Sequence, residues 1–189
     1  MVMDLFWGIS LYDIDIDLMD TINDINDMAE LNNIGVKWQQ TFEFSDKHKN
    51  FGFINLEDEK NVDVENGVSL LIHDLSKISS SIFTESSINY FNKNSITEEK
   101  FSNFYFTKFE DGAKEIKLYD DVSKENAKRV SFKYFINDSY EGGEIHFTNF
   151  NIKIKPKAGQ LLIHPSNYVY TYTEHSVNNG IKYQLISWI

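Results

Sequence analysis

Histidine and carboxylate side chains are among the groups in this sequence that could bind a metal or transfer protons. The 189 residues include 29 acidic residues, five histidines and no cysteine. Without cysteine there can be no disulfide, thiolate zinc site or cysteine nucleophile, so any catalysis must use other groups. The histidines are scattered along the chain, at His48, His73, His146, His164 and His175.

No common catalytic motif organises these groups. The sequence has no GxxxxGK[ST], HExxH or GxSxG pattern. The acidic segment YDIDIDLMD lacks the central glycine and the terminal glutamate of a calcium loop, which favours a solvated segment. His48 is expected in a loop, and His73 lies off the apolar stripe of an expected helix, so it should be exposed.

The net charge of −11 limits the partners of this protein. The negative electrostatic potential of a protein with this charge repels nucleic acid and anionic membrane surfaces, unless a local basic patch outweighs it. Lys153, Lys155 and Lys157 alternate and are expected on a solvated strand face. The N-terminus has no basic leader, and no apolar run approaches the roughly 20 residues of a membrane span. We expect a protein that is cytoplasmic when synthesised, with neither nucleic-acid nor membrane partners.

The first part of the chain mixes helix and strand signals. Apolar residues spaced three and four apart predict amphipathic helices over 17–31 and 67–83, and alternating aromatics predict a strand over 36–44. The length favours a single domain over 1–189. Within it, 1–100 is expected to be mostly helical support with early strands.

In the second part of the chain, 101–189, apolar residues recur at every second position. Many brief strands between tight turns predict an antiparallel barrel or jelly roll. The expected fold class is mainly β (α+β): a double-stranded β-helix, or jelly roll, with the N-terminal helices packed against its outside. The strand-like runs are FSNFYFTKF, RVSFKYFI, GEIHF, IKIK, QLLIH, YVYTYT and IKYQLISWI.

Three stretches of this second part resemble one family. They are RVSFKYFINDSYEGGEIHF, IKIKPKAGQLLIHPSNYVYT and VNNGIKYQLISWI. Together, over about Phe104 to Ile189, they resemble the prolyl-4-hydroxylase-like branch of the 2-oxoglutarate and Fe(II)-dependent oxygenases. The resemblance implies a jelly roll that holds iron on a His-x-Asp pair and a distant His, and a basic residue that clamps 2-oxoglutarate.

The residues at these family positions are mostly changed. The family spacing places the His-x-Asp pair on Leu118 and Asp120, the distant His on Tyr172 and the clamp on Lys182. Asp120 is thus the only retained family ligand. Leucine cannot coordinate a metal, and a phenol must lose a proton to do so at neutral pH, whereas an imidazole binds as the neutral ring. Lys182 and Tyr134 are the candidates for a remnant of the 2-oxoglutarate site.

A displaced histidine could still rebuild a metal site. His175 follows Tyr172 by three residues, which on a strand places it on the opposite face unless a bulge intervenes. His146 and His164 lie in strand-like runs. For each, the simpler interpretation is a structural histidine, either hydrogen-bonded in the wall of the barrel or facing solvent. The sequence leaves open whether any of the three supplies a ligand.

The loss of ligands favours a non-catalytic protein with the oxygenase-like fold, used as a structural or protein-binding module. No cofactor is expected in that case. Partners would be proteins, either further copies of the chain or the components of a virion, since the Asn-, Ile- and Lys-rich composition is common in viruses and phages. If Tyr168, Tyr170 and Tyr172 share one strand face, they are candidates for the contact surface.

Two alternatives remain. One is an active dioxygenase with an unusual centre, in which Asp120, Tyr172 and a displaced histidine bind Fe(II) and Lys182 binds 2-oxoglutarate. The other is a binder of small ligands or carbohydrate at the mouth of the barrel.

Overall fold

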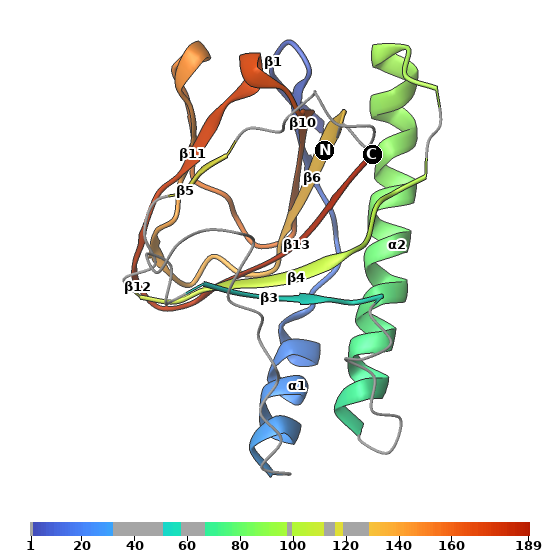
Figure 1. The fold of residues 1–189 in the computed structure, drawn as a ribbon, viewed down its shortest axis with the longest axis vertical. Coiled ribbons are helices and arrows are strands. Elements are labelled where there is room, and N and C mark those ends of the chain that lie inside the picture. Colours follow the sequence, from blue (N-terminus) through green and yellow to red (C-terminus); the bar gives the residue numbers. More distant parts are fainter. Residues whose placement is uncertain (1, 32–50, 58–66, 98–99, 112–115, 119–128) are drawn as a thin grey trace.

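Two helices cover one face of a large antiparallel sheet, and a smaller sheet lies over its other face (Figure 1). The computed structural model describes residues 2–31, 51–57, 67–97, 100–111, 116–118 and 129–189. The strand expected over 36–44 and His48 lie outside these residues. This arrangement is the mainly β jelly roll with helical support that the sequence predicts.

The large sheet has seven strands, and its central strands come from distant parts of the sequence. Strand β6 (Val130–Phe135) is buried at every residue, so both of its faces are covered. Among the described residues, those before 101 contribute three strands to this sheet as well as both helices. Its order is β1 (Val2–Phe6), β2 (Ile9–Asp13), β10 (Gln160–Pro165), β6 (Val130–Phe135), β13 (Lys182–Trp188), β4 (Tyr105–Phe109) and β3 (Phe51–Asn55).

The smaller sheets are made of two- and three-residue strands. The four-stranded sheet has the order β5 (Ile116–Leu118), β11 (Tyr172–Glu174), β8 (Ile145–Phe147) and β9 (Ile152–Ile154). A further pair consists of β12 (Val177–Asn179) and β7 (Glu141–Gly142). In the described part of the chain, 3-10 turns cover Thr148–Phe150 and Tyr168–Tyr170.

Both expected helices are present. Helix α1 covers Met19–Leu31, and α2 covers Gly67–Asn94, beyond the expected end at residue 83. The extension is stabilised by tertiary packing, because Tyr90 and Phe91 are buried against the sheet although their segment is rich in serine and asparagine. His73 is exposed, as predicted. Within the described part of the chain, neither helix has the length and apolar content that a membrane crossing requires.

Hydrophobic clusters lie on both faces of the large sheet. The outer one joins Phe83 of α2 to Phe132 and Tyr134 of β6. The inner one joins Phe135 of β6 to Phe147 of β8. Neighbouring β6 residues enter different clusters because side chains alternate along a strand. We call the space between the large and the four-stranded sheets the barrel interior, whose apolar members include Ile145, Phe135, Phe147, Leu162 and Tyr172.

The predicted strand YVYTYT is not continuous. Its first part is the 3-10 turn, because the side chain of Asn167 accepts a hydrogen bond from the Val169 N–H at 2.9 Å and so caps the turn. As a result, the tyrosines do not share one face. Tyr168 is 72% exposed, whereas Tyr172 is 6% exposed and belongs to the barrel interior.

Candidate functional site

The positions that the resemblance assigns to two imidazole ligands lie side by side. Leu118 and Tyr172 are Cα partners in the ladder between β5 and β11. The family spacing therefore identifies two strand positions that the fold brings together. Asp120 lies outside the described residues.

Tyr172 is packed into the barrel interior. Its ring centroid lies 5.1 Å from that of His164 and 5.6 Å from that of Phe147. The ammonium Nζ of Lys133 lies 4.6 Å from the centroid of the Tyr172 ring. A cationic amine is thus already next to the phenol.

The interior contains a buried ion cluster of two lysines and one glutamate. Nζ of Lys182 lies 2.5 Å from Oε1 of Glu174, and Nζ of Lys133 lies 2.7 Å from Oε2 of the same carboxylate. These three residues are at most 3% exposed. They come from β13, β11 and β6, so both sheets contribute to the cluster. We call Lys133, Glu174 and Lys182 the Lys–Glu–Lys cluster.

The charges in this cluster depend on each other. Burial alone would raise the pKa of Glu174, but Lys133 and Lys182 lower it to about 2. Burial disfavours the charged form of Lys133, yet the Glu174 carboxylate and the Tyr172 phenol raise its pKa above the ordinary value. For Lys182, burial outweighs the attraction of Glu174 and lowers the pKa. Glu174 is therefore an ionised carboxylate shared by two amines.

The backbone and aromatic rings complete the surroundings of Lys182. Its Nζ also donates to the Gly143 carbonyl at 2.9 Å and lies 5.3 Å from the Phe135 ring centroid. Gly143 has a φ of +64°, and a Cβ at this position would lie 2.8 Å from a ring carbon of Tyr140 and 3.2 Å from Cδ of Lys182. The EGGE turn therefore needs a glycine here to bring its carbonyl to the amine.

Tyr134 does not lie beside Lys182. It belongs to the outer cluster, and its hydroxyl donates to the carbonyl of Ile16. The next residue, Phe135, is the one that faces Lys182. Tyr134 is thus a link between β6 and the segment before α1, and the structure does not bring it into the barrel interior.

The three late histidines lie in two places. His164 is 1% exposed inside the barrel, where its Nδ1 donates to the Pro165 carbonyl at 2.9 Å and burial lowers its pKa to about 3. His146 and His175 stack with a centroid distance of 6.0 Å. His146 alternates with the interior residues Ile145 and Phe147, so it lies on the outer face of β8. Among the described residues, no three His, Asp or Glu side chains are grouped as a metal site would require.

Lys133 and Glu174 are absent from the sequence-based candidates, although a signal for them exists. Lys133 is a charged residue within a strand whose other positions are apolar or small. Glu174 follows Tyr172 by two residues and so shares its face. A lysine and a glutamate on inward-facing strand positions predict a buried ion pair, because an unpaired charge would be too costly there.

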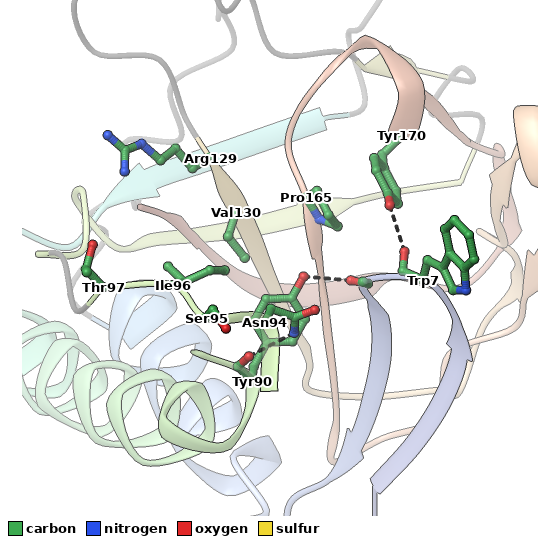
Figure 2. A pocket seen from close by; sticks show the side chains of 11 residues that line it. Trp7, Tyr90, Asn94, Ser95, Ile96, Thr97, Arg129, Val130, Pro165 and Tyr170 are labelled. Carbon is green, nitrogen blue, oxygen red and sulfur yellow. Dashed lines mark hydrogen bonds between the residues drawn. The ribbon is translucent and has the colours of Figure 1, made fainter. Parts of the chain in front are cut away.

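A separate cavity of about 410 Å³ lies outside the barrel interior (Figure 2). It is lined by residues near the end of α2 and by the β1–β2 turn, with Trp7, Arg129 and Pro165 among them. Two hydrogen bonds fix its walls, from the Tyr90 hydroxyl to the Gly8 carbonyl at 2.7 Å and from the Tyr170 hydroxyl to the Trp7 carbonyl at 2.8 Å. None of the Lys–Glu–Lys cluster lines it.

Comparisons with known proteins support the family resemblance at the level of fold. No family model and no curated protein sequence matches the chain. Among solved structures, a viral collagen prolyl hydroxylase from Paramecium bursaria Chlorella virus-1, in a 2-oxoglutarate complex, matches with a TM-score of 0.61 at 16% identity, covering 96% of this chain and 94% of that chain.

Two further solved structures agree. A prolyl hydroxylase from Trichoplax adhaerens, in complex with a hypoxia-inducible-factor peptide, matches with a TM-score of 0.65 at 13% identity, covering 96% of this chain and 82% of that chain. A Pseudomonas putida prolyl-4-hydroxylase matches with a TM-score of 0.60 at 12% identity, covering 96% and 91%. The chain therefore has the prolyl-4-hydroxylase-like fold of the 2-oxoglutarate oxygenases.

Proposed function

We propose that this protein is a non-catalytic module with an oxygenase-like fold that acts through contacts with other proteins. The observation that carries the proposal is the buried Tyr172 phenol, at the position that the resemblance assigns to the distant iron ligand, with the Lys133 ammonium 4.6 Å from its ring centroid. A cation next to this position opposes the binding of a second cation.

The described residues do not fit Fe(II). The resemblance implies two imidazoles and one carboxylate, whereas position 118 is leucine and position 172 is tyrosine. A phenol has an ordinary pKa of about 10 and must lose its proton to bind the metal, so at neutral pH it is a poorer ligand than an imidazole, which binds as the neutral ring. The repulsion between Lys133 and a dication adds to this cost.

The described residues also do not fit 2-oxoglutarate. The resemblance assigns the clamp for its distal carboxylate to Lys182, but Nζ of Lys182 already lies 2.5 Å from the Glu174 carboxylate. A second carboxylate at the same amine would lie against that of Glu174, and two like charges in a buried site repel strongly. No reaction step through 2-oxoglutarate is therefore assigned to this chain.

A row of aromatic rings, exposed at Phe6 and Trp7 and partly buried at Phe150 and Tyr170, offers a surface for the protein contacts that we propose. Phe6 lies 4.6 Å from Phe150, and Phe150 lies 5.0 Å from Tyr170, measured between ring centroids. Trp7 is 83% exposed and continues this row. We call Phe6, Trp7, Phe150 and Tyr170 the aromatic surface. Aromatic residues are enriched at protein interfaces because they bury large apolar areas at a low entropic cost.

The test of the non-catalytic proposal is an assay of the wild-type protein for metal content and for succinate formed from 2-oxoglutarate with Fe(II) and ascorbate. We expect no stoichiometric iron and no succinate above a buffer control. Succinate formation that Asp120→Ala and Lys182→Ala both abolish would reject the proposal. In that case the protein would be an active dioxygenase with an atypical centre.

A further inference from the structure

Beyond the proposed module function, we infer that the barrel interior is a carboxylate-binding site that the chain fills with its own Glu174 side chain. The ligand class that this site takes is a small aliphatic carboxylate. Without the Glu174 carboxylate, the two lysines would hold a free carboxylate of similar size, such as propionate.

Within the Lys–Glu–Lys cluster, the two lysines hold the Glu174 carboxylate as a binding site holds a carboxylate ligand. Each oxygen of the carboxylate has its own amine, Oε1 with Lys182 and Oε2 with Lys133. The two amines come from β13 and β6 of the large sheet, whereas Glu174 comes from β11 of the facing sheet. The carboxylate thus reaches across the interior to a two-amine clamp on the opposite wall.

The charge balance makes an anion necessary at this place. Two lysines are buried here against one carboxylate, and a buried charge without a partner is very costly. Glu174 supplies the anion from within the chain, so its local concentration at the clamp is set by the fold and exceeds that of a free ligand. The wild-type protein should therefore exclude free carboxylates from the clamp.

The interior also has hydrogen-bonding capacity that Glu174 does not use. Tyr140 Oη is buried and has no hydrogen-bond partner among the described residues. Tyr140 is close to the clamp, since Nζ of Lys182 lies 5.8 Å from its ring centroid. Its hydroxyl can donate to a ligand that is oriented differently from the Glu174 side chain.

The test replaces the side chain by a free ligand. Glu174→Ala removes the carboxylate and leaves space for propionate, and Glu174→Gln fills the same space without the charge. We expect the thermal midpoint of Glu174→Ala to rise by roughly 5–10 °C at propionate concentrations about 100 times the dissociation constant, relative to sodium chloride of equal ionic strength. The wild-type protein and Glu174→Gln should show no such rise.

A second variant and a refolding measurement complete the test. Adding Lys182→Met to Glu174→Ala should abolish the propionate effect, because the clamp loses one amine. If Glu174→Ala does not fold in chloride, its recovery from urea in propionate is measured instead, and recovery supports the site. An absent propionate effect, or an equal effect in Glu174→Gln or in the double variant, would overturn the inference.

Metal-free 2-oxoglutarate, added to Glu174→Ala as a second probe, separates this inference from the proposed function. Stabilisation by 2-oxoglutarate as well as propionate would support the site and show that it accepts a longer dicarboxylate. Stabilisation by propionate alone would support a site limited to the size of the Glu174 side chain. Succinate formation by the wild-type protein would reject the non-catalytic proposal, whereas the propionate result decides the clamp by itself.

Discussion

Lys182 and Glu174, eight residues apart in the sequence, face each other across the barrel interior with 2.5 Å between Nζ and Oε1. Removing the charge of Glu174 leaves two buried amines without a counter-ion. We expect Glu174→Gln to lower the free energy of unfolding at pH 7 by about 3–5 kcal/mol, measured by urea denaturation. Glu141→Gln, at an exposed glutamate of β7, is the matched control and should cause no measurable change. Equal stability of the two variants would show that the ion cluster contributes little.

The stability of Glu174→Gln should recover at alkaline pH. The pKa of Lys182 is already lowered by burial in the wild-type protein, and loss of Glu174 removes the main opposing attraction. The folded state then favours the neutral amine, while the unfolded chain still binds a proton, so stability rises with pH up to the unfolded lysine pKa of about 10.4. Urea denaturation at pH 7, 8.5 and 10 measures this. A deficit relative to wild type that stays constant over this range would contradict the expectation.

His164 should make the wild-type protein sensitive to mild acid. Its pKa is lowered to about 3 by burial, whereas an unfolded histidine titrates at about 6.5. The unfolded chain therefore takes up a proton first as the pH falls, and stability decreases between about pH 6.5 and 3, by on the order of 1 kcal/mol per pH unit. His164→Phe, whose ring can pack against Phe147 and Tyr172, should flatten this slope. Glu174 titrates lower, so urea denaturation between pH 6.5 and 5 isolates His164; an unchanged slope there would exclude it as the cause.

Tyr134→Phe tests the outward position of this side chain. Loss of the hydroxyl removes its hydrogen bond to the Ile16 carbonyl, and we expect a decrease in the free energy of unfolding of about 1 kcal/mol. Because Tyr134 lies on the outer face of β6, the propionate response of Glu174→Ala should be the same with and without Tyr134→Phe. A weakened response would mean that Tyr134 contributes to the clamp.

Trp7→Ala tests the aromatic surface. Trp7 is 83% exposed, so its removal should leave the thermal midpoint unchanged while weakening self-association or the binding of a protein partner. Sedimentation velocity over a concentration series measures self-association. Ile88→Ala, at an apolar residue of α2 that is 55% exposed, is the matched control for loss of exposed apolar area. Identical sedimentation of wild type, Trp7→Ala and Ile88→Ala as monomers would exclude self-association through this surface.

The strand pattern predicts the architecture better than it predicts the direction of individual side chains. In β6 both faces are buried, so hydrophobicity does not distinguish Tyr134, which faces the helices, from Phe135, which faces Lys182. The same pattern does not predict that Lys133 is buried, because its partner, Glu174, lies in another sheet. Such pairings depend on strand register, and register is decided by tertiary packing.

Local hydrogen bonding accounts for another difference between sequence and structure. The alternation in YVYTYT is that of a strand, but the Asn167 side chain caps a 3-10 turn over Tyr168–Tyr170. The sequence therefore predicts the strand at β11 and misses the turn before it. Asparagine side chains compete with strand pairing in this way because they reach the backbone two residues on.

The position of β13 constrains how this chain can fold during translation. Although β13 is the last strand in sequence order, it pairs with both β6 and β4 near the middle of the large sheet. While the ribosome still holds residues 182–188, β4 and β6 each lack this neighbour and expose unpaired edges. Unpaired edges promote association between nascent chains, so we expect newly made copies of this protein to depend on chaperones until β13 is released.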